Sequence, residues 1–257
     1  ERGVDRQVEP AGVAPHVPRQ IREVRGGEAQ TDVAVPSPLA IRNDLTSPVM
    51  VVQAEGDVVG SNLGARQPDT ATFREWELAG TSHADAYTIA VGGTDTGTGT
   101  GATAMFGYMR NPLNVGCTNP ANAGAHHWIL QAAYHHLEAW VRDGTLPPAG
   151  PPLQVTSTSP TVLARDAQGN ALGGVRSPQV DAPVATLTGS NSGAGLCVLF
   201  GTTVPLTTTQ LGALYADHSA FVSQWSASLT AAVNGGFILP ADQAELLAAA
   251  TGSTIPS

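Results

Sequence analysis

The sequence predicts an α/β fold built around a small parallel sheet. Three features predict it: a short apolar segment and a short alternating segment that are both typical of strands, polar residues directly after each of them, and a long amphipathic segment further along the chain. The 29 glycines and 19 prolines among 257 residues favour a loop-rich domain over a helix bundle. No apolar run approaches the 18 residues of a membrane-spanning helix, so no membrane span is expected.

The charge composition argues against one class of partner. The chain has 21 acidic residues, 12 arginines and no lysine, which gives a net charge of −9. Nucleic-acid binding depends on clustered cations, and no basic cluster is present. We therefore expect no nucleic-acid partner.

The predicted strands lie near the start of the main domain. Residues 1–35 are expected to form an extended lead-in, with a short helix near 18–25, and residues 36–257 to form the domain. Within residues 47–54, the short apolar and β-branched run that follows Pro48 predicts the first strand, a buried strand of a parallel sheet. The alternating residues 73–78 predict the second strand.

The rest of the chain is predicted to alternate loops, helices and short strands. A Gly/Thr-rich mobile loop is expected first, then an amphipathic helix, then a C-terminal decoration that begins with strands and turns and ends in helices. The corresponding ranges are 92–104 for the loop, 121–143 for the helix, 150–257 for the decoration, 166–170 for a turn within it, and 208–232 and 241–250 for its helices.

An acid and a histidine follow the two predicted strands. Asp57 comes just after the first strand, and His83 comes just after the second. The carboxyl ends of neighbouring parallel strands meet at one edge of a sheet, so we expect these side chains to converge there. A carboxylate would orient the imidazole, which could then act as a general base toward a nucleophile.

The residues around this pair resemble a known family. Pro48 to Asp57, the sequence RQPD at 66–69 and the sequence FREWELAGTSHAD at 73–85 look like the C-terminal half of an α/β-hydrolase. More narrowly, roughly residues 38–250 are similar to a bacterial alpha/beta hydrolase domain family of esterase-like proteins. The resemblance implies strands seven and eight of the usual hydrolase sheet, followed by additional C-terminal strands and helices.

The resemblance also assigns roles. In this fold the catalytic triad runs in the order nucleophile, acid, histidine, which places the acid at Asp57 and the base at His83. Glu55 is the second choice for the acid, because it lies at the end of the same strand. Asp57 is preferred because it lies in the turn beyond the strand.

The expected nucleophile is missing from this pattern. The G-x-S-x-G turn of the family should precede the acid, but no such turn occurs before Asp57, and Ser37 and Ser47 lack flanking glycines. We therefore expect an N-terminal half, supplied as a cleaved chain or as a further segment, to carry the nucleophile. Ser82 fits a loose version of the turn, but its position beside His83 suits a hydrogen bond that holds the loop better than a nucleophile.

The expected reaction is hydrolysis of a small-molecule ester through an acyl-enzyme, with transfer to an alcohol as a variant on the same scaffold. A structural or binding subunit without catalysis, part of a secreted or cell-envelope assembly, is the alternative. No nucleotide, flavin or other cofactor is expected, because Gly97, Gly99 and Gly101 do not form a dinucleotide-binding fingerprint.

The remaining histidines and the cysteines carry two further expectations. No metal site is expected, because no HExxH motif or i,i+4 histidine pair occurs. One histidine, His218, is instead expected within an apolar stripe. The others are expected at helix surfaces and interfaces: His126, His127, His135 and His136. Cys117 and Cys197 are expected to form a disulfide in a secreted or cell-envelope protein, with two buried free thiols as the alternative.

Overall fold

A two-stranded parallel sheet lies where the sequence predicts it. The computed structural model describes residues 37–256. Strand β1 (Val49–Ala54) pairs in parallel with β2 (Phe73–Leu78), with Val49 opposite Phe73 and Ala54 opposite Leu78. The predicted parallel pairing is therefore confirmed. The lead-in expected over 1–35, with its short helix, lies outside the described residues.

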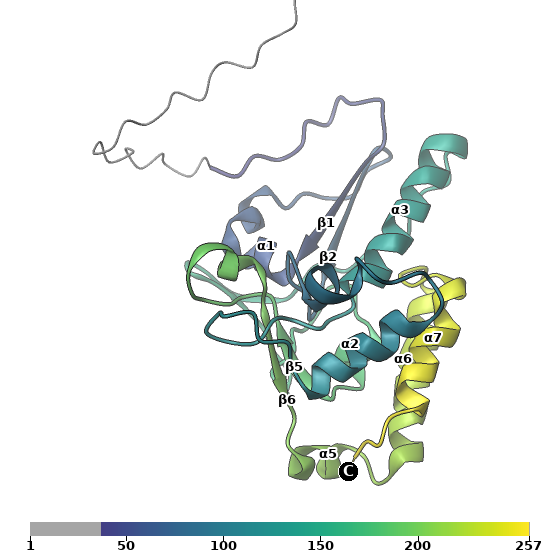
Figure 1. The fold of residues 1–257 in the computed structure, drawn as a ribbon. Coiled ribbons are helices and arrows are strands. Elements are labelled where there is room, and N and C mark those ends of the chain that lie inside the picture. Colours follow the sequence, from purple (N-terminus) through teal and green to yellow (C-terminus); the bar gives the residue numbers. More distant parts are fainter. Residues whose placement is uncertain (1–36, 257) are drawn as a thin grey trace, which may run out of the picture. The chain divides into compact units, whose positions relative to one another are not determined.

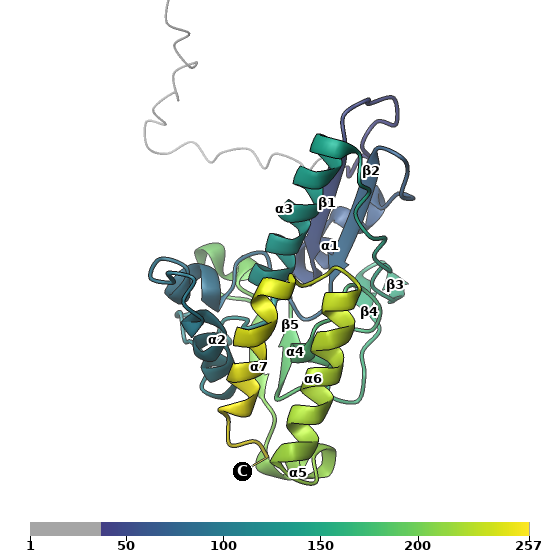
Figure 2. The same ribbon diagram turned by 90° about the vertical axis from the view of Figure 1, so that its right-hand side faces the viewer.

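Helix α3 (His126–Asp143) covers one face of this sheet, as Figures 1 and 2 show. It begins five residues later than the predicted 121–143, because the backbone just before it is engaged elsewhere: the Asn122 amide donates to the Phe200 carbonyl. Gly144 ends the helix in a left-handed conformation, with φ of 79°, that few other residues adopt. Trp76 of β2 and Trp128 of α3 are both fully buried and anchor the core.

The Gly/Thr-rich segment is shorter as a loop than expected. Residues 92–104 were predicted to be a mobile loop throughout, but the loop ends at Gly99, and helix α2 (Thr100–Arg110) begins directly after it. The prediction was wrong for the last five residues. The reason lies just beyond them: Met105, Phe106 and Met109 are spaced for one helix face, and their burial outweighs the weak helix propensity of Gly101.

The predicted helix at 208–232 is two helices. Helix α5 (Thr208–Leu214) and helix α6 (His218–Asn234) are separated by a short break. The break arises because Asp217 caps α6, its side chain accepting a hydrogen bond from the Ala220 amide at 2.8 Å. The last helix, α7 (Gln243–Thr251), packs against both α6 and α2 (Figure 2).

The C-terminal decoration contains the short strands that the sequence predicts. Two antiparallel pairs form here, β3 with β4 and β5 with β6, and each is a separate two-stranded sheet. The turn expected at 166–170 is present, because Asp166 accepts hydrogen bonds from the amides of Gln168 and Asn170. No helix within residues 37–256 has the length and apolar character to cross a membrane.

The remaining bounds complete the described chain. The strands and α-helices are α1 (Glu55–Gly60), β3 (Val155–Thr158), β4 (Thr161–Leu163), α4 (Pro178–Asp181), β5 (Ala185–Thr188) and β6 (Thr202–Pro205). The short helices of other types are η1 (Asn62–Ala65), η2 (Tyr87–Val91), η3 (Gly195–Leu199) and η4 (Pro240–Asp242).

Candidate active site

Asp57 and His83 meet at the carboxyl edge of the parallel sheet. Asp57 lies in α1, which follows β1 directly, and His83 lies in the loop after β2. The Asp57 Oδ1 atom is 2.8 Å from His83 Nδ1. Because a carboxylate only accepts, Nδ1–H is the donor, and the lone pair of the neutral ring lies on Nε2.

The backbone fixes the orientation of the carboxylate. Its second oxygen, Oδ2, accepts a hydrogen bond from the Ala54 amide at 2.9 Å. Asp57 is therefore held at both oxygens, while the His83 side chain is 58% exposed. An imidazole oriented by a carboxylate and open on its far side can remove a proton from a group that approaches Nε2.

Glu55 is engaged by groups other than His83 and connects the segments around the site. Its carboxylate is almost fully buried and accepts hydrogen bonds from the amides of Gly80 at 2.6 Å and Gly189 at 3.3 Å. Arg165 pairs with the same carboxylate at 3.1 Å. Burial raises the pKa of Glu55, against the opposing effect of Arg165. The structure thus brings Asp57 to the histidine and engages Glu55 elsewhere.

The loop that carries His83 is fixed on both sides. It starts at Gly80, whose φ of 69° and whose approach to Val180 leave no room for a Cβ atom. The Gly80 carbonyl accepts a hydrogen bond from Asn122 Nδ2 at 3.1 Å, and the Ala86 amide donates to the Asn122 carbonyl at 2.8 Å. A side chain between these anchors has a defined position.

Ser82 holds this loop from within. Its side chain is fully buried, and its hydroxyl donates to the Ala84 carbonyl at 2.8 Å. This is the loop-holding hydrogen bond that the sequence suggested. Within residues 37–256, no serine or cysteine hydrogen-bonds to His83.

His126 is a neighbour of the site that sequence reasoning missed. It starts α3, hydrogen-bonds to the Ser82 backbone, and interacts electrostatically with both Asp57 and His83. Burial lowers the pKa of His126, against the opposing effects of Asp85 and Asp57. Burial therefore favours the neutral form of the His126 ring. Its sequence position on a predicted surface helix gave no signal of this proximity.

The other helix histidines serve packing. His127 stacks on Tyr87 with ring centroids 3.7 Å apart, and burial lowers its pKa. His136 Nε2 hydrogen-bonds to the Gly236 carbonyl at 2.8 Å, and His218 contacts two carbonyl groups near the end of the described chain. Among residues 37–256, no group of three or more histidine, cysteine or acidic side chains is arranged to hold a metal ion.

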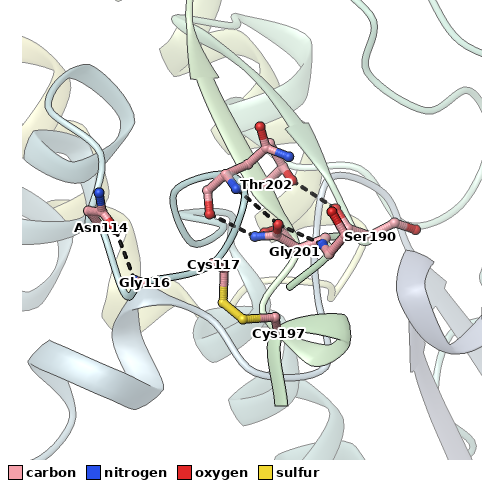
Figure 3. The surroundings of a disulfide bond; sticks show 10 residues. Asn114, Gly116, Cys117, Ser190, Cys197, Gly201 and Thr202 are labelled. Carbon is pink, nitrogen blue, oxygen red and sulfur yellow. Dashed lines mark hydrogen bonds between the residues drawn. A yellow bond between two sulfur atoms is a disulfide. The ribbon is translucent and has the colours of Figure 1, made fainter. Parts of the chain in front are cut away.

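A disulfide stabilises the surface next to the His83 loop. Cys117 and Cys197 are bonded, and the bond joins the segment before α3 to η3 (Figure 3). Beside it, the Gly116 amide donates to the Asn114 side chain and the Thr202 hydroxyl donates to the Ser190 carbonyl. The Leu199 carbonyl, at the end of η3, accepts from the Ala84 amide at 3.0 Å, so the disulfide-linked segment reaches the residue after His83.

A comparison with protein families identifies the family to which this sequence is similar. The model of a family described as alpha/beta hydrolase domain matches residues 10–248, nearly the whole chain. Neither a search of curated proteins nor a search of solved structures found a match.

Proposed function

The chain belongs to the alpha/beta hydrolase domain family, and from that membership we propose that it provides the acid and the base of a serine-type ester hydrolase. The observation that carries the proposal is the 2.8 Å contact between Asp57 Oδ1 and His83 Nδ1, in a histidine whose side chain is 58% exposed. Asp57 takes the role of the acid. Glu55 does not, because its two oxygens are committed to Gly80, Gly189 and Arg165.

The proposed chemistry uses the two ring nitrogens of His83 in turn. Nδ1–H stays bonded to Asp57, which stabilises the imidazolium when it forms. Nε2 removes the proton of a serine hydroxyl as that oxygen attacks the ester carbonyl, and the same proton then passes to the leaving alcohol. In the second half of the reaction, Nε2 removes a proton from a water molecule as the water oxygen attacks the acyl-enzyme carbonyl. The bond to the serine oxygen then breaks, the proton passes from Nε2 to that oxygen, and the carboxylic acid product leaves.

We propose that the serine lies on a polypeptide segment that pairs with β1. Among the described residues β1 pairs with β2 alone, and a parallel sheet with helices on its faces normally continues beyond two strands. An apolar groove of about 240 Å³ runs beside β1, lined by Met50, Val52, Leu130, Ala133, Tyr134 and Leu137.

The helix above this groove is also apolar on its open side. Tyr134, Leu137 and Val141 follow one another at spacings that put them on one side of α3. Tyr134 is 64% exposed and Val141 is 66% exposed. Such a surface suits an additional buried strand and the helix that follows it, which is how the family's nucleophile turn is built. No such turn precedes Asp57 in the sequence.

Replacement of His83 tests the proposed reaction. We expect the hydrolase, with its nucleophile-bearing segment, to hydrolyse p-nitrophenyl acetate and His83→Ala to lower turnover by about 10³-fold or more, because the general base is lost. His135→Ala is the matched control, since His135 is an exposed histidine of α3. Equal turnover in the wild type and in His83→Ala would refute the assignment.

A non-catalytic structural or binding subunit is the second candidate. It is favoured by one observation, that no serine or cysteine among residues 37–256 hydrogen-bonds to His83. In that case the β1 edge would bind a partner that carries no nucleophile. The chain and any bound partner would then hydrolyse no ester and would take up no serine-directed probe.

We further propose a secreted or cell-envelope location. The support is the disulfide between Cys117 and Cys197, because such bonds persist mainly in oxidising compartments. Alkylation of the protein in denaturant should modify neither cysteine until a reductant is added. Two modified cysteines without a reductant, in protein freshly taken from its native source, would contradict this location.

A further inference from the structure

Two large apolar side chains project from η3, the disulfide-linked segment whose last residue hydrogen-bonds to the residue after His83. Leu196 and Val198 of η3 are 65% and 61% exposed, whereas Cys197 between them is buried. Exposed apolar residues are common singly, but here two stand on one short helical turn. Together they offer an apolar contact surface on one turn.

The segment is held in place rather than free to fold these side chains inward. The disulfide fixes the middle of η3, and before η3 the Asn191 side chain donates to the Asn119 carbonyl at 2.9 Å. Its end is fixed at Leu199, whose carbonyl accepts from the amide of Ala84. The two exposed side chains are thus rigidly presented on a turn whose last residue contacts the neighbour of His83.

The disulfide joins two stretches of the chain that contain no charged side chain. Residues 111–125 and 182–216, the two stretches joined by the disulfide, contain no Asp, Glu, Lys or Arg, although the chain has a net charge of −9. Neither stretch itself offers an ion-pair partner to a charged substrate group, whereas a neutral apolar group loses little on leaving water. The chemistry of this surface therefore matches a neutral, apolar ligand.

We propose that Leu196 and Val198 contact the apolar chain of a neutral ester whose carbonyl lies at His83. This inference rests on the proposed function and deepens it by naming the substrate class. A protein partner is the less favoured occupant, because the surface suited to a further strand lies along β1 and α3, and η3 belongs to neither. The two residues then set the preference for longer chains over short ones.

The test compares two esters in the complete hydrolase. The wild type should have a higher kcat/KM for p-nitrophenyl hexanoate than for p-nitrophenyl acetate. In Leu196→Ser/Val198→Ser this preference should fall at least about fivefold. Each methylene group of the hexanoate chain that no longer contacts an apolar side chain weakens binding roughly fourfold. The kcat/KM for the acetate should stay within about twofold of the wild type.

A double variant elsewhere supplies the control. Leu146→Ser/Val162→Ser removes the same two residue types, exposed at 48% and 46%, from positions outside the disulfide-linked segment. It should leave the preference unchanged. An unchanged preference in Leu196→Ser/Val198→Ser would overturn the inference. So would an equal loss for both esters accompanied by release of the nucleophile-bearing polypeptide, since that result identifies a protein interface.

A second readout separates this inference from the proposed reaction. If the wild type hydrolyses neither ester, the proposed function fails, and photolabelling decides the inference alone. A neutral octyl ester carrying a diazirine on its chain should label the peptide that contains residues 195–200, and Leu196→Ser/Val198→Ser should lose that label. Labelling that is unaffected by the substitutions would contradict the inference.

Discussion

Removal of the Glu55 carboxylate should destabilise the protein without removing the acid that orients His83. In Glu55→Ala, the amides of Gly80 and Gly189 and the guanidinium of Arg165 lose their shared acceptor at 2.6, 3.3 and 3.1 Å. Leaving a buried donor unsatisfied costs about 1–3 kcal/mol, and breaking a buried ion pair from one side costs about 3–5 kcal/mol. Because these costs overlap and Arg165 is partly exposed, we expect a loss of about 3–5 kcal/mol in the free energy of unfolding.

Urea unfolding followed by tryptophan fluorescence measures this loss. Glu138→Ala is the control, because Glu138 is a carboxylate on the exposed surface of α3 that also pairs with an arginine, Arg142. Its removal should change the free energy of unfolding by less than about 0.5 kcal/mol. A loss below about 1 kcal/mol in Glu55→Ala would refute the structural role of the carboxylate. So would full stability combined with turnover as low as that of an Asp57 variant.

Three further perturbations follow from the same contacts. Asp57→Asn should lower turnover by about 10³- to 10⁴-fold in the ester assay. The free energy of unfolding should change by less than about 1 kcal/mol, because the oxygen of the asparagine side chain can still accept from the Ala54 amide. Full activity would show that the acid is assigned wrongly. Cys117→Ala/Cys197→Ala should lose about 4 kcal/mol in urea unfolding, because the bond closes a loop with a sequence separation of 80; a loss under about 1 kcal/mol would contradict this. Burial, with a smaller effect of Glu245, raises the pKa of Asp242 to about 6. Protonation of Asp242 therefore stabilises the folded state. This stabilisation is complete below the pKa of the group in the unfolded chain, about 4, and is lost as the pH rises through 6. Relative to Asp242→Asn, the wild type should therefore lose about 1 kcal/mol between pH 4 and pH 7, a value reduced for solvent screening; a relative stability that rises with pH would contradict the direction.

The strands and the Asp57–His83 contact were predictable because their causes are local. Short β-branched runs indicate strands whatever the rest of the fold does, and a parallel pair brings its carboxyl ends together. Asp57 and His83 are 26 residues apart, and the parallel pairing of the two strands is enough to predict that they lie near each other. The different positions of Glu55 and Asp57 also have a local basis, because Glu55 follows β1 directly and is buried, whereas Asp57 lies two residues further on and is partly exposed.

The features that sequence reasoning missed depend on contacts between distant segments. His126 lies behind the site because α3 packs on β1, and its own sequence surroundings give no sign of that packing. Helix α2 begins inside a Gly/Thr-rich stretch because of apolar residues that follow the stretch. The anchoring of the His83 loop by Asn122 joins positions 42 residues apart through one side chain, which no periodicity reveals.

The most direct measurement of the central claim is the mass of the species that a fluorophosphonate probe labels. The probe reacts with a serine activated by an oriented histidine, and a denaturing intact-mass spectrum of the purified sample identifies the labelled polypeptide. The proposed function predicts label on a second polypeptide or on a longer one, at a serine outside residues 1–257, and no label when His83 is replaced by alanine. Label within residues 1–257, on Ser82 or on any other serine, would contradict the proposed origin of the nucleophile, and the absence of label on every species would contradict the hydrolase itself.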